Sequence, residues 1–107
     1  MAKALVENWF EAFKQRDISL LQLAEDFNHS SPFGIIKGKQ AYLDMISQNE
    51  EAFFSPSLEI LDTFECGDKY AVRYLVNGNP ACDCFYIKDG FISQIHSYYH
   101  FGQKPSF

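Results

Sequence analysis

Few side chains in this chain of 107 residues could move protons near neutral pH. The candidates combine imidazole, carboxyl and phenol groups, and they are His29, His96, His100, Asp83, Tyr74 and Tyr99. Imidazole titrates close to physiological pH, so histidine suits general acid–base catalysis. His29 stands just before a Ser-Ser-Pro turn. Two interpretations of it stay open: a catalytic role in a ligand pocket, or a hydrogen bond that only holds the turn.

A second candidate arrangement pairs a histidine with a carboxylate. We expect His96 and Asp83 to lie opposite each other across a hairpin, a spacing that suits an imidazole oriented by a carboxylate. The same two residues could equally form a partly exposed cross-strand pair at a dimer surface. His100 is expected to be a surface residue at the end of a strand.

The cysteines offer less chemistry than their spacing first suggests. Cys82 and Cys84 should project from one face of a strand, but a structural zinc site needs four suitably spaced ligands, which this chain lacks. We expect small buried side chains, no metal and no cofactor. An odd cysteine count, with Cys66 as the third, is also unlike a secreted disulfide framework and favours reduced thiols in the cytoplasm.

Composition limits the classes of partner. The net charge is −5 and no basic run occurs, so nucleic acid is not an expected partner. No stretch approaches the roughly 20 apolar residues of a spanning helix, so a membrane is not expected either. With 47% hydrophobic and 17% aromatic residues, residues 1–107 should form a single soluble domain with its own core.

Helical patterns dominate the first half of the chain. An apolar stripe predicts a helix over residues 2–15 that buries Trp9 and Phe13. Asp17 is a suitable N-cap for a short second helix over residues 18–24. An extended piece around residues 27–31 should end at Pro32 and Gly34, and a third helix after Gly38 should carry Tyr42 and continue to Phe53.

The second half follows strand periodicity. Three turn signals, Cys66-Gly67-Asp68, Asn77-Gly78-Asn79-Pro80 and Asp89-Gly90, divide it into runs of about 57–65, 69–76, 81–88 and 91–100. With the earlier extended piece, the order is α-α-β-α-β-β-β-β. This order predicts an α+β fold in which helices cover one face of a mostly antiparallel sheet.

Several short motifs occur in a characteristic order along nearly the whole chain. The first helix ends in Arg16-Asp17, Ser31-Pro32-Phe33-Gly34 follows, Gly38-Lys39 opens the third helix, and Asp89-Gly90-Phe91-Ile92 leads into a strand ending Tyr98-Tyr99-His100. This order resembles the nuclear transport factor 2-like superfamily, which includes SnoaL-like polyketide cyclases, ketosteroid isomerases, scytalone dehydratase and limonene epoxide hydrolase. The resemblance implies a cystatin-like cone, whose curved sheet wraps around the N-terminal helices and leaves an apolar pocket.

Strand alternation then selects the side chains of the implied pocket. If the Asp89-Gly90 hairpin has two loop residues, Cys84 faces Ile95 and Cys82 faces Ser97 on the concave side. The expected pocket residues are Trp9, Phe13, Tyr42, Val72, Cys82, Cys84, Ile95 and Ser97. The opposite, convex face would carry Phe85, Ile87, Ile92 and His96, together with Asp83 and Gln94. Relatives commonly dimerise through this face, so we expect a homodimer.

The functional residues of the relatives carry over only in part. Ser31 stands where ketosteroid isomerases place a general-base Asp, and Trp9 stands where they place a tyrosine that holds the oxyanion. Asp83 falls at or near their protonated Asp. The charged set of limonene epoxide hydrolase would fall on Ser97, Tyr74 and Val76. Steroid-type isomerisation is therefore not expected.

Two functions remain open. The first is acid–base catalysis by an isomerase, cyclase or dehydratase acting on a small apolar carbonyl compound, with His29, Tyr74, Tyr99 and Asp83 as catalytic candidates. His29 is the preferred proton carrier, because tyrosines with a pKa of about 10 are poor bases at neutral pH. The alternative is a non-catalytic ligand-binding or dimerisation module of the same fold.

Overall fold

The computed structural model describes residues 2–99, so His100 lies outside the described residues. Its helical elements are α1 (Ala2–Gln15), the short 3₁₀ helix η1 (Ile18–Leu20), α2 (Lys39–Gln48) and α3 (Glu50–Phe54). Its strands are β1 (Leu23–Ser31), β2 (Gly34–Lys37), β3 (Leu58–Cys66), β4 (Lys69–Val76), β5 (Asn79–Lys88) and β6 (Phe91–Tyr99).

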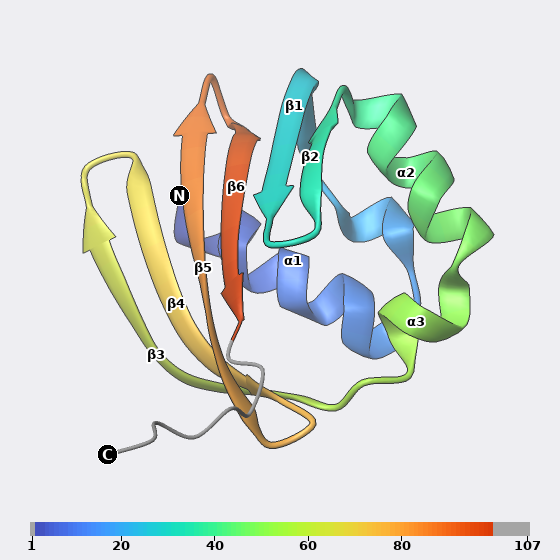
Figure 1. The fold of residues 1–107 in the computed structure, drawn as a ribbon. Helices are drawn as coiled ribbons and strands as arrows, with labels where there is room; N and C mark the ends of the chain where they lie inside the picture. Colours follow the sequence, from blue (N-terminus) through green and yellow to red (C-terminus); the bar gives the residue numbers. More distant parts are fainter. Residues whose placement is uncertain (1, 100–107) are drawn as a thin grey trace.

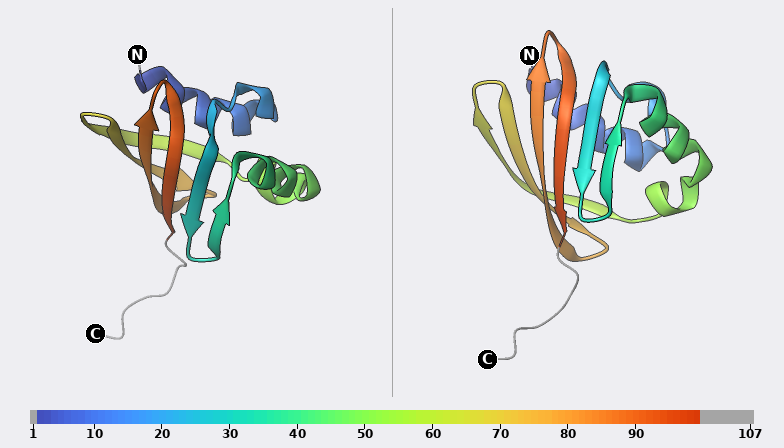
Figure 2. Two further views of the ribbon diagram at one scale, coloured as in Figure 1. Left: turned by 90° about the horizontal axis from the view of Figure 1, so that it is seen from above. Right: turned by 45° about the horizontal axis from the view of Figure 1, so that its top comes forward.

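The strands form one curved, open sheet in the order β2-β1-β6-β5-β4-β3 (Figure 1). All neighbouring strands are antiparallel except β1 and β6, which are parallel. The views in Figure 2 place α1 across one face of this sheet, with α2 and α3 beyond β2. The predicted α+β fold, a curved sheet around N-terminal helices, is confirmed.

The core lies between α1 and the concave face of the sheet. The apolar stripe of α1 buries Val6, Trp9 and Phe10, each at most 4% exposed, against fully buried sheet residues such as Phe85. The rings of Trp9 and Phe85 pack edge to face, with their centroids 5.9 Å apart. The periodic apolar positions of residues 2–15 therefore form the helix, and attach it to the sheet, as predicted.

Three local predictions need correction. Asp17 does cap a helix, accepting a hydrogen bond from the Ser19 amide, but that helix ends at Leu20. Its expected continuation instead joins the sheet: the Ile92 amide donates to the Gln22 carbonyl, and Leu23 begins β1. Strand pairing overrides local helix propensity here.

The other two corrections concern the middle of the chain. The segment after Pro32, expected to be a break, forms strand β2 and pairs with β1. The expected third helix is divided into α2 and α3 at Asn49, whose backbone leaves the helical region at φ −138° and ψ 42°. The Asn49 side chain donates to the Met45 carbonyl and so terminates α2.

A β-bulge between β5 and β6 changes which side chains face the core. Next to the Asp89-Gly90 turn, Ile87 pairs with Ile92 as the two-residue loop predicts, but the register then shifts by one residue. Beyond the shift, Phe85 pairs with Ile95 and Asp83 pairs with Ser97. An extra residue in one strand reverses the faces of all later pairs, because side chains alternate with a period of two.

The sidedness predicted for β5 was therefore wrong. Cys82 and Cys84 point to the convex face and do not line the pocket, whereas Asp83 and Phe85 point to the concave face and are buried. Two residues that were expected on the dimer surface instead belong to the interior: Ile92 is fully buried, and Ile87 packs against the core. Of the six residues assigned to that surface, only Gln94 and His96 lie on the convex face, opposite Tyr86 and Cys84.

Trp9 provides a test of the core. It is 4% exposed and contacts Phe13, Phe27, Tyr42 and Phe85. Trp9→Ala should lower the free energy of unfolding by about 3–5 kcal/mol in urea titrations, because it removes a buried aromatic side chain. The matched control is Phe33→Ala, whose ring is 80% exposed; the expected change is within about 0.5 kcal/mol. Equal losses for both variants would contradict the buried position of Trp9.

Candidate functional site

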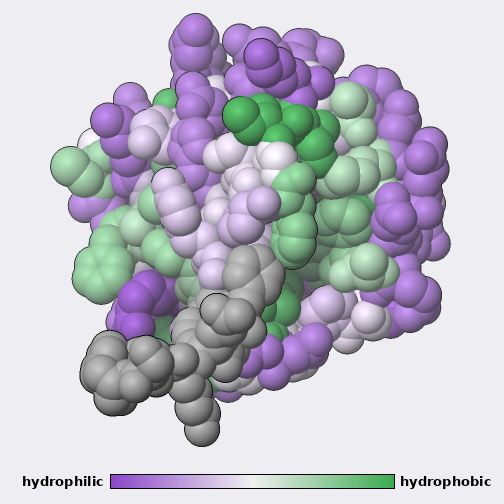
Figure 3. Space-filling view, in the orientation of Figure 1, coloured by the Kyte–Doolittle hydropathy of each residue, from purple (hydrophilic) through white to green (hydrophobic). Residues whose placement is uncertain are grey.

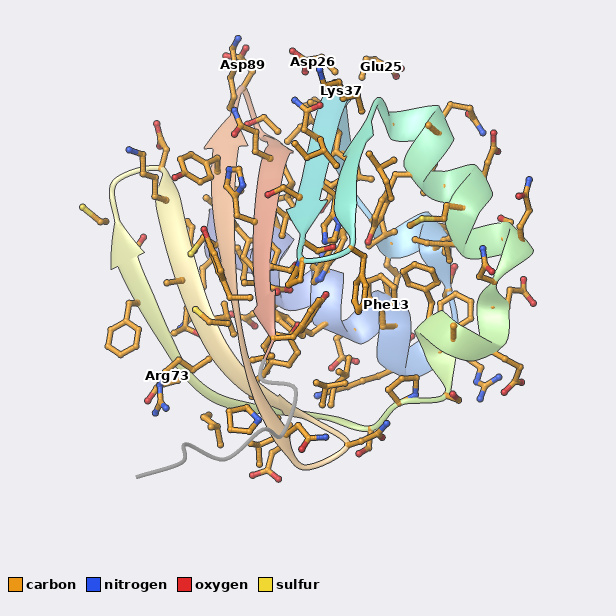
Figure 4. All side chains as sticks on the ribbon, viewed as in Figure 1. Phe13, Glu25, Asp26, Lys37, Arg73 and Asp89 are labelled. Carbon is orange, nitrogen blue, oxygen red and sulfur yellow. The ribbon has the colours of Figure 1, made fainter. Side chains whose placement is uncertain are left out.

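A cavity of about 510 Å³ opens between the concave face and the helices α1, α2 and α3. Trp9, Phe13 and Tyr42 form part of its wall, as predicted. The Trp9 and Tyr42 rings stack with centroids 5.7 Å apart. Figure 4 shows Phe13 projecting into the space between the sheet and the helices, whereas Arg73 lies on the outside. Hydrophobic residues also gather on the visible surface between the strands and α2 (Figure 3).

Two predicted pocket residues have a different position. Val72 and Ile95 point to the concave side but are fully buried, and neither contributes to the cavity wall. They belong to the packed core beneath the cavity. Cys82 and Cys84 are also absent from the cavity wall. The predicted pocket residues that do line the cavity are Trp9, Phe13, Tyr42 and Ser97.

The polar part of the cavity is built on three neighbouring strands. Asp83 of β5 is 3% exposed and pairs across the sheet with Ser97 of β6. The Tyr74 hydroxyl, from β4, donates to Asp83 Oδ1 over 3.0 Å. Burial raises the Asp83 pKa to about 6, although hydrogen bonds from Ser97 and Tyr74 lower it. A carboxyl with this pKa changes charge close to neutral pH.

His29 completes the polar group from β1. It is 8% exposed, and its Nε2 lies 3.0 Å from Ser97 Oγ. Its ring also contacts that of Tyr42, with centroids 5.2 Å apart. Burial, with a smaller contribution from His96, lowers the His29 pKa to about 4. The imidazole is therefore neutral at physiological pH and a weaker base than sequence alone suggested.

The two tyrosines at this end keep their protons. Burial raises the pKa of Tyr74 and of Tyr99, and the Asp83 charge adds to both shifts. The Ser97 and Tyr74 hydroxyls lower the Tyr99 pKa without cancelling this rise. Both hydroxyls consequently act as donors in the cavity wall.

The structure thus brings together all four predicted catalytic candidates, His29, Tyr74, Tyr99 and Asp83, with Ser97 at their centre. The proposed pairing of Asp83 with His96 was wrong, because the bulge places them on opposite faces. The sequence does contain a sign of the bulge: Ile92 and Ile95 are both inward, and two polar residues separate them instead of one.

His96 has its own partners on the convex face. Its Nδ1 hydrogen bonds with Ser30 Oγ, and its Nε2 lies 3.2 Å from the Gln94 amide oxygen. No group of three or more His, Cys, Asp or Glu side chains in residues 2–99 is arranged to hold a metal ion. None of the helices in these residues is both long and apolar enough to cross a membrane.

The two buried titratable groups predict opposite dependences of stability on pH. The pKa of Asp83 rises on folding from 3.8 to about 6, so a penalty of about 3 kcal/mol appears as pH increases from 4 to 6. The pKa of His29 falls on folding from 6.5 to about 4, so a similar penalty appears as pH decreases from 6.5 to 4. These effects nearly cancel in the wild-type protein.

Urea unfolding at several pH values between 4 and 6.5 separates the two groups. Asp83→Asn should leave the His29 effect alone, so its stability should fall as the pH is lowered. His29→Gln should leave the Asp83 effect alone, so its stability should rise over the same interval. Parallel pH profiles for the two variants would contradict the burial of these groups in their stated charge states.

Comparisons with known proteins agree with this architecture. A family model described as a SnoaL-like domain matches residues 6–95. No curated protein matches the chain. A SnoaL-like protein of unknown function from Burkholderia thailandensis superposes with a TM-score of 0.81 at 20% identity, covering 92% of this chain and 93% of that one.

Two further solved structures have names that suggest activities. A protein from Sinorhizobium meliloti provisionally named a polyketide cyclase gives a TM-score of 0.78 at 26% identity, covering 87% of this chain and 92% of that one. A provisionally named ketosteroid isomerase from Kribbella flavida gives a TM-score of 0.77 at 20% identity, covering 97% of this chain and 81% of that one. Because the family model spans most of the chain, this protein belongs to the family of SnoaL-like domains.

Proposed function

We propose that this protein is an acid–base catalyst acting on a small, largely apolar carbonyl compound, with Asp83 as the group that takes up and returns the proton. The observation that carries this proposal is a carboxyl that is 3% exposed in a cavity rich in aromatic side chains and has a pKa of about 6. General bases work best when their pKa lies near the working pH. The provisional names of the solved structures, polyketide cyclase and ketosteroid isomerase, also suggest chemistry next to a carbonyl group.

The proposed step uses the carboxylate and the phenols in separate roles. The Asp83 carboxylate forms an O–H bond with a proton from the carbon next to the carbonyl. The electron pair of the broken C–H bond moves toward the carbonyl oxygen, and a hydroxyl such as that of Tyr99 donates to that oxygen. Return of the proton from Asp83 to the substrate completes an isomerisation, or assists loss of a hydroxyl in a dehydration.

The alternative, a non-catalytic binding module, is favoured by one specific observation. Within residues 2–99, every buried side-chain nitrogen or oxygen has a hydrogen-bond partner. Asp83 accepts a hydrogen bond from the Tyr74 hydroxyl, and the Ser97 hydroxyl also stabilises its charged form. A polar group satisfied within the protein also suits a module that binds a ligand's polar end without catalysis. Only an assay that responds to proton transfer distinguishes the two functions.

Elimination of 5-nitrobenzisoxazole is a suitable assay, because this apolar heterocycle opens to a coloured phenolate when a base removes its ring proton. The rate should increase as Asp83 ionises, with a midpoint near pH 6. Asp83→Asn should lower kcat/KM by about 10²–10⁴-fold. The matched control is Asp26→Asn, which removes an exposed carboxyl outside the cavity and should leave the rate unchanged. A rate that Asp83→Asn does not alter would favour the binding module.

We also propose a homodimer formed through the convex face, with residues that differ from those first expected. One cross-strand row on this face runs from Ile35 through Ser30, His96, Cys84 and Ala71 to Phe64. Ile35 and Phe64 are 66% and 57% exposed, and Tyr98 beside this row is 60% exposed. Large exposed apolar side chains on one sheet face support self-association.

Analytical ultracentrifugation at micromolar concentration tests the dimer. The wild-type protein should sediment with about twice the chain mass of 12.3 kDa. Tyr98→Glu should give the monomer mass, because two charged groups would meet at the centre of the face. Phe33→Glu, which places the same charge at the β1–β2 turn, should leave the dimer intact. A monomeric wild-type protein would overturn this proposal.

The cysteines support a cytoplasmic location for the proposed activity. Cys66 is exposed and Cys82 and Cys84 are half-buried, and all three are free thiols. Exposed thiols persist in a reducing compartment, whereas disulfides are typical of oxidising ones.

A further inference from the structure

Ser97 lies between the two buried titratable groups of the cavity. Its Oγ is 3.0 Å from His29 Nε2. Its direct cross-strand partner on the same face is Asp83, close enough for the Ser97 hydroxyl to lower the pKa of that carboxyl. Ser97 is 2% exposed, so water does not compete for these contacts. A hydroxyl donates one proton and accepts up to two. It can therefore receive a proton on one side while it releases its own on the other.

The second ring nitrogen of His29, Nδ1, is not buried. Nδ1 has no hydrogen-bond partner within residues 2–99, yet no buried side-chain nitrogen in these residues lacks a partner. Nδ1 is therefore accessible, and since His29 lines the cavity, this atom opens into it. Asp83 lines the same cavity. The row of neighbouring side chains Asp83, Ser97 and His29 consequently reaches the cavity at both ends.

We propose that Asp83, Ser97 and His29 form a proton relay whose two ends, the Asp83 carboxyl and His29 Nδ1, reach different positions of one bound substrate. This inference rests on the proposed acid–base function and deepens it. The substrates would be compounds that lose a proton at one atom and gain one at another, as in a proton shift or a dehydration. The proton would then cross the cavity wall without passing through bulk water.

Three proton transfers connect the two ends of the relay. At the start, Asp83 is a carboxylate that accepts from the Ser97 hydroxyl, and His29 Nε2–H donates to Ser97 Oγ. Nδ1 takes a proton from the substrate, Nε2 passes its proton to Ser97 Oγ, and Ser97 passes its original proton to Asp83. At the end, Asp83 is a neutral acid and His29 is again neutral, now with its proton on Nδ1. Reversal of the three transfers returns the proton to the substrate from Nδ1. Alternatively, Asp83 donates its new proton directly to the other position of the substrate, and proton exchange with water then returns His29 to the Nε2-protonated tautomer.

The direction of the transfer follows from the surroundings. The titratable groups that face this chain are Tyr74 of β4, Tyr99 of β6 and Tyr42 of α2, and burial raises the pKa of all three, so they stay protonated. His96 acts on His29 from the convex side. The wall formed by α1 contributes Trp9, Phe10 and Phe13, which do not titrate. With a pKa of about 6 against about 4 for His29, Asp83 is where the proton settles.

Nitrogen-15 NMR of the imidazole tests the relay without any substrate. In the wild-type protein the Nε2-protonated tautomer should dominate above pH 6. As Asp83 takes up its proton near pH 6, the Ser97 hydroxyl should turn toward Nε2, and neutral His29 should change to the Nδ1-protonated tautomer. The two nitrogen signals should therefore exchange their protonated and unprotonated frequencies well above the pH at which His29 becomes charged.

Variants identify the residues responsible for this exchange. Ser97→Ala and Asp83→Asn should each abolish the change near pH 6, and Ser97→Thr should retain it. The control Ser47→Ala, at an exposed position of α2, should not affect it. The His29 signals are assigned by their loss in His29→Gln. A tautomer that stays constant through pH 6 in the wild-type protein, or a change that persists in Ser97→Ala, would overturn the relay.

The two proposals fail in distinguishable ways. If the tautomer is constant but Asp83→Asn still loses benzisoxazole elimination, Asp83 acts alone, and only the relay is wrong. If the tautomer changes as expected but no elimination occurs, the relay stands as a property of the site, and the proposed catalytic function is wrong.

Discussion

One additional residue in β6 determines the chemistry of the cavity. The bulge near Ser93 shifts the pairing of β5 and β6 by one residue, and so places Asp83 and Ser97 side by side on the concave face. In a regular hairpin, Cys82 and Cys84 would occupy that face and the carboxyl would point outward. Bulges often occur beside functional sites because they redirect side chains without changing the fold. Here the redirected side chain is the buried carboxyl of the site.

The site is a balance between desolvation and local hydrogen bonds. An isolated carboxylate in an aromatic cavity would be strongly destabilised, and the Asp83 pKa would rise much further than it does. The hydroxyls of Tyr74 and Ser97 offset part of that cost by donating to the charged form. Burial, with a smaller contribution from His96, leaves His29 neutral. One net charge therefore titrates in a cavity that holds several polar groups.

The sequence predicts the elements well and the faces of the sheet less well. Helix α1 and the strands after Pro56 follow strong periodicities and clear turn signals, such as Asn77-Gly78, and the structure has them at nearly the predicted bounds. A one-residue shift in register leaves almost no trace in composition, yet it reverses every later side chain. Asp83 was thus identified as a candidate but assigned to the wrong face. Strand β2 was missed because a run of four residues gains its structure from pairing with β1 rather than from its own pattern.

The central position of the last described strand has a consequence for how the chain reaches its folded state. Strand β6 lies between β1 and β5, so it joins the first strand to the meander formed by β3, β4 and β5. During synthesis from the N-terminus, the edges of β1 and β5 that pair with β6 stay unpaired until the segment through Tyr99 has left the ribosome. Contacts between residues about seventy positions apart, such as His29 with Ser97, form only then. Assembly of the polar site and completion of the sheet are therefore the same late event in folding.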